Sequence, residues 1–245
     1  AYPNLHAIAT RERSRAPVQH ESLDRFLSHG RDTLTRGPVA LIFVEDEIEV
    51  GSTLRHHLDC GFASVLALIP DEFAIPSEVA ARVHRIGFDP RPVSAFAGAV
   101  NRIITAAPGT WFYYGFNAEY LFYPFCETRT VGEMLAFHAE ERREAMLAYV
   151  IDLYADDLAQ VPSAVSIERA HLDRSGYYAL ARPDPATGRP RDRQLDFFGG
   201  LRWRYEEHIP KRSRRIDRIS LFRAREGLVL QDDHTFNDQE FNTYA

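Results

Sequence analysis

The sequence has few cysteines, a single lysine and no long apolar run, and each shortage narrows what the chain can be. Its 245 residues include only Cys60 and Cys126, without CxxC spacing, which excludes a disulfide scaffold and a cysteine-based zinc site. A chain of this length builds a core without disulfides. We therefore expect a reducing compartment, the cytoplasm. No stretch approaches the roughly 20 apolar residues that span a bilayer, so we expect no membrane span.

The charge is acidic overall but locally basic. The net charge of −6 argues against a general nucleic-acid-binding protein, so we expect no nucleic-acid partner. Lys211 is the only lysine, and residues 201–225 hold nine basic and three acidic residues. The interpretation that we favour for the arginine excess is a GC-rich genome. The other interpretation is that arginine forks bind phosphate.

Several common motifs are also missing. The chain has no GxGxxG after its first strand, no GxxxxGK[ST], no GxSxG and no HExxH. Walker-type nucleoside triphosphatases, standard dinucleotide oxidoreductases and α/β-hydrolases are therefore unlikely classes.

What the sequence does contain is an alternation of strand and helix patterns over residues 38–155. Continuous apolar runs predict buried strands, and apolar residues at helical spacing predict helices between them. The alternation predicts an α/β fold with a mostly parallel sheet flanked by helices. The expected strands are 39–44, 64–69, 83–87, 111–116 and 146–154, and the expected helices start near residues 46, 76, 92 and 130.

The two ends of the chain follow other patterns. We expect a loose N-terminal arm and a short helix capped by Ser22 over residues 1–37, and one domain over residues 38–245. Residues 173–200 are rich in Arg, Pro, Asp and Gly and predict a long loop. One further strand is expected at 218–222, within an irregular C-terminal region.

Polar residues follow several of the expected strands. Ligands of parallel sheets bind beyond the carboxyl ends of the strands, which directs attention to Glu45–Glu47, Asp71 and Asn117–Glu119. Carboxylates at these places can bond ribose hydroxyls or base N–H groups. The alternative is that the acids simply favour a helix N-terminus.

The segment 43–62 resembles the opening of family 2-like glycosyltransferases with the GT-A fold. Asp46-Glu47, Leu54, His57, Gly61 and Phe62 match that family's pattern at its spacing. The resemblance implies a GT-A-like, Rossmann-type sheet and a glycosyltransferase that takes its sugar from a nucleotide-sugar donor. It also implies nucleotide binding by the residues at two strand ends, Val44, Asp46, Glu47 and Asp71.

The family's metal motif is altered here. Asn117-Ala118-Glu119 stands where the family has Asp-x-Asp. Mg²⁺ and Mn²⁺ prefer carboxylate oxygens, so we expect a weakly bound ion with Glu119 as the better ligand and Asn117 as a poor one. Without a metal ion, arginines of the basic stretch such as Arg212 and Arg215 can bind the diphosphate of the donor. The alternative is that the basic stretch is a solvated surface.

Asp232-Asp233-His234 follows the last expected strand. The family has a histidine downstream of its late strand, and we predict Asp233 or His234 as the catalytic base. The alternative is an ordinary turn, since Asp-Asp is common turn chemistry.

Two rival functions stay open at this stage. One is a non-catalytic GT-A-like protein that binds a nucleotide or sugar and has lost the metal motif. The other is an unrelated nucleotide-binding α/β enzyme. The acceptor, whether a sugar, a lipid-linked molecule or a protein, is not indicated.

Overall fold

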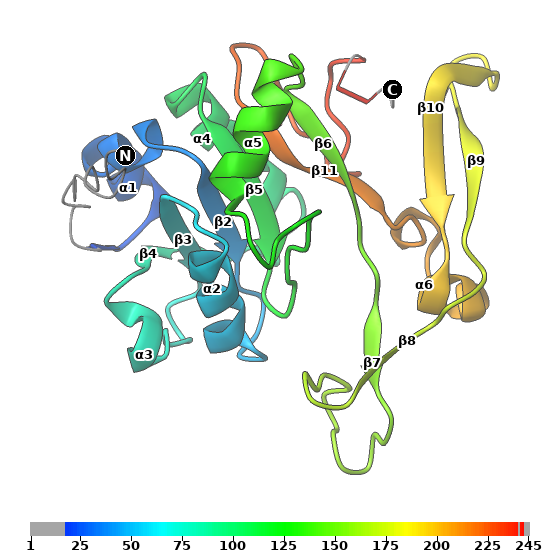
Figure 1. The fold of residues 1–245 in the computed structure, drawn as a ribbon, viewed down its shortest axis with the longest axis horizontal. Helices are drawn as coiled ribbons and strands as arrows, with labels where there is room; N and C mark the ends of the chain where they lie inside the picture. The colour runs from blue at the N-terminus through cyan, green and yellow to red at the C-terminus, as the bar shows by residue number, and fades with distance from the viewer. Residues whose placement is uncertain (1–17, 240, 243–245) are drawn as a thin grey trace, which may run out of the picture.

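The computed structural model describes residues 18–239, 241 and 242, and its body is a seven-stranded sheet between two layers of helices (Figure 1). Five strands run parallel, whereas β11 is antiparallel to both β5 and β6. The expected α/β class with a mostly parallel sheet is confirmed. In spatial order the strands are β1 (Gln19–His20), β4 (His84–Gly87), β3 (Ser64–Ile69), β2 (Val39–Phe43), β5 (Trp111–Phe116), β11 (Asp217–Arg223) and β6 (Ala145–Tyr149).

The central strand β2 explains why its sequence is apolar throughout. All five residues are buried, with Leu41 and Phe43 in the core cluster on one face and Ala40 and Ile42 in the cluster on the other. Side chains alternate between faces along a strand, so a strand covered on both faces needs apolar residues at every position.

Helices cover both faces of the sheet. On one face, Phe26 and Val100 belong to the same core cluster as Phe236 from the C-terminal segment. On the other face, Leu54 and Val131 belong to the second cluster. The helices of the body are α1 (Leu23–His29), α2 (Val50–Asp59), α3 (Ser77–Ala80), α4 (Ala95–Ala106) and α5 (Val131–Glu140), with the 3-10 helix η1 (Arg31–Thr35).

The helix boundaries follow the signals in the sequence. Gly61 follows α2 with φ +83, and a Cβ there would lie 2.9 Å from the Cβ of Thr130, so only glycine fits. Thr130 and Glu133 form the capping box expected at the start of α5. Of the N-terminal region expected over residues 1–37, residues 1–17 lie outside the described part, and Ser22 caps α1 as expected.

The lobe, defined here as residues 150–216, departs from the body and corrects two expectations. The long loop expected over residues 173–200 is wrong, because β9 and β10 form an antiparallel hairpin there. The strand expected over 146–154 is divided between β6 and the separate strand β7. The elements of the lobe are β7 (Leu153–Ala155), β8 (Ala170–Leu172), β9 (Tyr178–Pro183), β10 (Pro190–Phe198), α6 (Gly200–Arg204), η2 (Glu206–His208) and η3 (Lys211–Ser213).

The hairpin was missed because proline and charged residues surround its turn, although Tyr178 and Leu180, and Leu195 and Phe197, alternate further from the turn. Only Arg182 is buried among the six residues of β9. The turn between the strands is a normal one, in which the Asp184 carboxylate accepts hydrogen bonds from the backbone N–H groups of Ala186 and Thr187. The residues next to the turn therefore interrupt the periodic hydrophobic signal before it spans either strand.

The lobe leaves and rejoins the sheet at one point. The backbone N–H of Val150 donates to the carbonyl of Ile216 at 2.7 Å, next to the pair Tyr149 and Asp217 of β6 and β11. Within the described residues, no helix has the length and apolar character needed to cross a bilayer.

Candidate functional site

The edge formed by the carboxyl ends of the parallel strands brings most of the predicted site residues together. β2 ends at Phe43 and β5 at Phe116, and the antiparallel β11 begins at the same edge with Asp217. The chain passes from β2 to β3 on one side of β2 and later crosses to β5 on the other side. The topological switch point therefore lies between β2 and β5, which is where open α/β sheets bind ligands.

Asn117, at the end of β5, ties the loops of this crevice together. Its side-chain oxygen accepts from the backbone N–H of Glu45 at 2.9 Å. Its amide nitrogen donates to the Asp46 carboxylate at 2.6 Å and to the carbonyl of Ile48 at 2.9 Å. An amide is required for both roles at once, because a carboxylate offers no donor.

Glu119 lies two residues further on and binds a buried arginine. Its two carboxylate oxygens accept from the two terminal nitrogens of Arg218 at 3.0 and 2.5 Å. One oxygen also accepts from the backbone N–H of Phe116 at 2.9 Å. Arg218 stacks over the rings of Tyr114 and Phe116, and its Nε has no hydrogen-bond partner among the described residues. Burial alone would lower the pKa of Arg218, but the Glu119 carboxylate holds it above its ordinary value.

The two predicted metal ligands do not fit a divalent ion in this arrangement. The Asn117 oxygen is bonded to a backbone N–H, and both Glu119 oxygens are bonded to a guanidinium. The part of the chain that the structure describes also holds no group of three His, Cys, Asp or Glu side chains placed to hold a metal. We therefore derive no step through a metal ion.

The predicted nucleotide-binding residues all lie at the ends of β2 and β3. Val44 is buried and extends the pairing of β2 with β3, because its N–H donates to the carbonyl of Leu68 at 2.9 Å. A ligand can therefore contact the backbone of Val44 but not its side chain. Asp46 accepts from the N–H of Ile48 at 2.8 Å in a tight turn, and Glu47 is exposed. The Asp71 carboxylate is largely exposed and contacts Arg85 at 3.3 Å.

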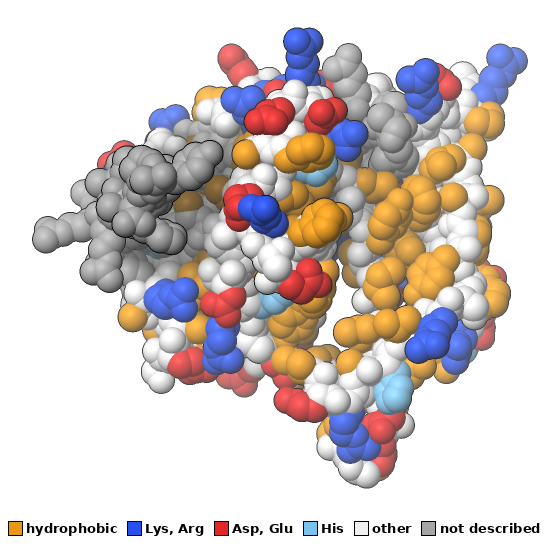
Figure 2. All heavy atoms as spheres, in the orientation of Figure 1, with side chains coloured by type: hydrophobic (Ala, Val, Ile, Leu, Met, Phe, Trp, Pro, Cys, Tyr) orange, Lys and Arg blue, Asp and Glu red, His pale blue; other side chains and the backbone are white. Residues whose placement is uncertain are grey.

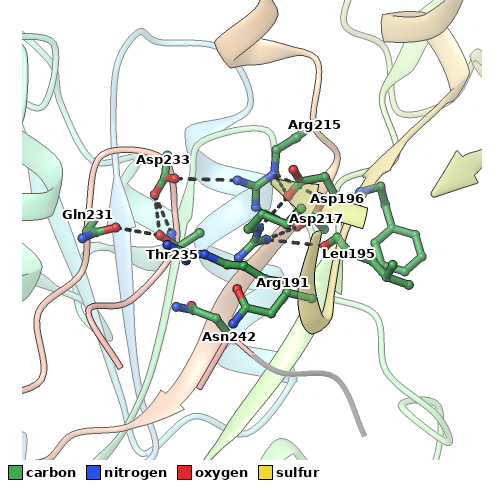
Figure 3. A network of polar contacts seen from close by, with 12 residues as sticks. Arg191, Leu195, Asp196, Arg215, Asp217, Gln231, Asp233, Thr235 and Asn242 are labelled. Atoms are coloured by element: carbon green, nitrogen blue, oxygen red, sulfur yellow. Dashed lines mark hydrogen bonds and ion pairs between the residues drawn. The ribbon is translucent and has the colours of Figure 1, made fainter. Parts of the chain in front are cut away.

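The two predicted phosphate-binding arginines lie in different surroundings. Arg215 is surrounded by carboxylates (Figure 3), with its nitrogens 2.7 Å from Asp217, 3.2 Å from Asp196 and 3.8 Å from Asp233. These carboxylates hold its pKa above the ordinary value although burial acts in the opposite direction. Arg212 is exposed on η3.

The predicted catalytic pair is held by two different sets of contacts. The Asp233 carboxylate accepts from the N–H of Thr235 at 3.0 Å and from its hydroxyl at 2.7 Å, which is the turn chemistry weighed above. The His234 ring stacks on Tyr114 and Phe96, with Nδ1 3.0 Å from the Tyr114 hydroxyl. Burial, and then the charge of Arg218, lower the pKa of His234 to about 4, so its ring is neutral at pH 7.

A polar pocket of about 280 Å³ lies at the switch point. Burial, together with the charges of Glu119 and Asp46, raises the pKa of Glu45 at its mouth. The pocket therefore contains two proton acceptors, Glu45 and His234, which come from opposite ends of the sequence. Its lining includes Glu45, Asn117, Glu119, Arg202, Arg215, Asp217, Arg218 and His234.

Sequence reasoning directed attention to Glu45, which directly follows a strand, and to the basic stretch that contains Arg218, but it missed Arg202 as a site residue. Arg202 had no positional signal, because it reaches the pocket only through the lobe, where it binds Asp152 with bonds of 2.6 and 2.9 Å.

Comparison with protein-family models, with curated proteins and with solved structures finds no match to this chain. The candidate site therefore has to be interpreted from its own geometry.

Proposed function

We propose that the chain is a glycosyltransferase that moves a sugar from a nucleotide-sugar donor to an acceptor hydroxyl. The observation that carries the proposal is the position of the polar pocket at the switch point between β2 and β5, lined by charged side chains of both signs. The resemblance of residues 43–62 to family 2-like glycosyltransferases supports the same class.

The donor fits along the strand ends in this proposal. The nucleoside lies over the ends of β2 and β3, where Asp46, Glu47 and Asp71 offer carboxylates to ribose and base. The diphosphate then lies beside Arg215 and Arg218, and its oxygens take the place of carboxylates that these guanidinium groups bind in the structure, since their planar forks also suit phosphate. The chain's own guanidinium groups thus supply positive charge for the departing diphosphate.

The transfer step is a displacement at the anomeric carbon of the donor sugar. The acceptor oxygen forms the new bond to that carbon, while the bond to the diphosphate oxygen breaks and the nucleoside diphosphate leaves with the electron pair. The hydroxyl proton passes to Glu45 or His234. A carboxyl group whose pKa is raised is the better base of the two, because the imidazole has a pKa of about 4.

A second candidate function is a non-catalytic GT-A-like protein that binds a nucleotide or sugar. The observation in its favour is that Asn117 and Glu119 both serve structural contacts in place of metal ligation. Both candidates predict nucleotide binding, but only the first predicts turnover. A cytoplasmic location belongs to either proposal, and the free thiols Cys60 and Cys126 suit it.

The test is a thermal-shift screen of UDP, GDP, CMP and dTDP species with Mn²⁺ or with EDTA, followed by an assay of nucleoside diphosphate release from the sugar donors that bind. We expect one nucleotide class to stabilise the protein in EDTA as well as in Mn²⁺. Glu45→Gln and His234→Gln should bind the donor normally while one of them loses turnover. Binding without any turnover would favour the second candidate, and no nucleotide binding would exclude both.

A further inference from the structure

A groove of about 1660 Å³ lies between the lobe and the body, where β6, β11, α2 and residues 118–124 line it. Figure 2 shows a hollow between body and lobe, with hydrophobic side chains gathered on the lobe's inner side. Its volume exceeds the roughly 300–1,000 Å³ of ordinary small-molecule sites. A sugar or a nucleotide alone would therefore leave most of it unfilled.

Large apolar side chains of the groove are open to solvent. Tyr149, the last residue of β6, and Ile151 after it are 48% and 42% exposed, and Leu153 of β7 is 52% exposed. Leu172 of β8, the cross-strand partner of Leu153, is 50% exposed. Single exposed apolar residues are normal, but a concave and continuous apolar surface marks a binding site.

The charges of the groove balance and are largely neutralised within its walls. Arg202 binds Asp152, and Arg218 binds Glu119, so these cations are already paired. A strongly anionic partner such as a nucleic acid needs unpaired basic residues, which this wall does not present. The charged residues of the lining are Arg55, Arg202, Arg218, Asp59, Glu119 and Asp152.

The groove is continuous with the polar pocket. Five residues line both hollows, among them the paired Arg202 and Arg218. An occupant of the groove that reaches this junction therefore has an apolar body on one side and a polar end on the other, beside Glu45 and His234.

We propose that the groove binds the hydrocarbon chain of an amphiphilic acceptor and delivers its hydroxyl end to the polar pocket. This inference rests on the proposed function, and it narrows the acceptor to a lipid-type molecule. The hydroxyl at the polar end is the nucleophile of the displacement described above, so no further reactant is needed. Burial of each CH₂ group in the apolar walls supplies affinity, and the polar end fixes the register of the chain.

The experiment measures displacement of the uncharged dye N-phenyl-1-naphthylamine by hexyl and dodecyl β-maltosides, each below its micelle concentration. The two competitors share a hydroxyl-rich head and differ only in chain length. We expect the dodecyl compound to displace the dye at least about tenfold more tightly, because the groove buries the additional CH₂ groups.

Two variants and one control locate the binding. Ile151→Asp and Leu172→Asp each place a charge on the lobe side of the groove and should each weaken dodecyl maltoside at least about tenfold, the direction expected when a charge enters an apolar site. Leu158→Asp is the control, because Leu158 is a lobe residue with 62% exposure outside the groove lining, and it should bind as the wild type does. Circular dichroism confirms that each variant is folded.

The outcomes separate this inference from the proposed function. Equal affinity for the two maltosides, or equal loss in Leu158→Asp, overturns the groove assignment while donor binding stands. Dye binding with the expected chain-length dependence but no nucleotide binding supports the apolar site and removes the proposed function. A stable dimer in sedimentation that Ile151→Asp dissociates would assign the groove to a second copy and overturn the inference.

Discussion

The body and the lobe contain strands of similar length but reach opposite degrees of burial. β2 is buried at all five positions, whereas β9 is buried only at Arg182. The buried residues of the lobe include polar ones such as Asp173 and Gln194. Arg182 binds Asp196 within the hairpin at 2.8 Å and reaches Asp217 of β11 at 3.5 Å, and the Tyr149 ring contacts that of Phe197, so an ion pair and an aromatic contact join the lobe to the sheet.

The difference teaches that only the body carries its own hydrophobic core. Apolar burial is the main stabilising term of a domain, and the lobe leaves much of its apolar surface open toward the groove. The body thus provides the stability and the switch point, and the lobe provides an exposed apolar surface that a ligand can bury.

Substitution of one leucine in the body and one in the lobe tests the difference in burial between the two regions most directly. Leu66→Ala in β3 removes a fully buried side chain and should cost about 3–5 kcal/mol of unfolding free energy. Leu180→Ala in β9 removes a side chain that is 55% exposed and should stay within about 0.5 kcal/mol. Urea denaturation measures both, and equal losses would contradict the contrast between body and lobe.

Removal of an ion pair in each region tests the same difference in burial, with a slightly smaller expected loss of unfolding free energy. Glu119→Ala leaves the buried Arg218 charge uncompensated and should destabilise the protein by about 3 kcal/mol. In the lobe, Arg169 and Asp156 form an exposed pair, and Arg169→Gln should leave the denaturation midpoint unchanged. A neutral result for Glu119→Ala would show that the Arg218 charge finds water or another partner.

A buried histidine of the body should make stability depend on pH. Burial lowers the pKa of His57 from 6.5 to about 4, so the unfolded chain binds a proton between these values that the folded chain does not. The contribution is complete above pH 6.5 and is lost as the pH falls toward 4, by about 2 kcal/mol at pH 5. His57→Phe should flatten this slope, and His171→Phe at an exposed site in the lobe should leave it unchanged. Urea denaturation at pH 5, 6 and 8 measures the three slopes.

The smallest change in unfolding free energy is expected for two side-chain amides, one in the body and one in the lobe, that each donate to a carboxylate. Asn117→Asp sets a second carboxylate against Asp46 and should cost about 1–2 kcal/mol at pH 7, with recovery at a pH that protonates the pair. Gln160→Glu in the lobe, which faces Asp157 at an exposed turn, should cost less than about 0.5 kcal/mol. Chemical denaturation at pH 7 and pH 4 measures both, and a stabilised Asn117→Asp in Mn²⁺ would revive the metal site.

The sequence predicts the body well because its signals are local. The apolar run of β2, the glycine stop at Gly61 and the capping box at Thr130 each act over a few residues. The hairpin of β9 and β10 has turn chemistry at Asp184, but proline and charged residues flank the turn and interrupt the hydrophobic pattern before it spans either strand.

The candidate site is predictable in position but not in its pairings. Topology alone places Asp46, Asn117 and Glu119 at one edge of the sheet. The partners are separated by 71 residues for Asn117 and Asp46 and by 99 for Glu119 and Arg218. Which carboxylate binds which donor depends on side-chain distances of a few tenths of an ångström, and spacing in the sequence carries no information about them.

The hydrogen bond between Val150 and Ile216 brings the two ends of the lobe together, so the lobe can be exchanged as one insertion in the sheet. Residues 150 and 216, the two ends of the lobe, are already in contact, so a connecting segment of any length can join them. Doubling the length of that segment costs only about 0.6 kcal/mol of loop-closure entropy. The sheet register at Tyr149 and Asp217 is set by two strands of the body, but the buried Asp217 carboxylate takes hydrogen bonds from Arg215 and from the N–H of Phe197 in the lobe. Evolution or design can therefore replace the 67-residue span of 150–216 and change what the molecule recognises, provided that the new span again supplies donors to Asp217.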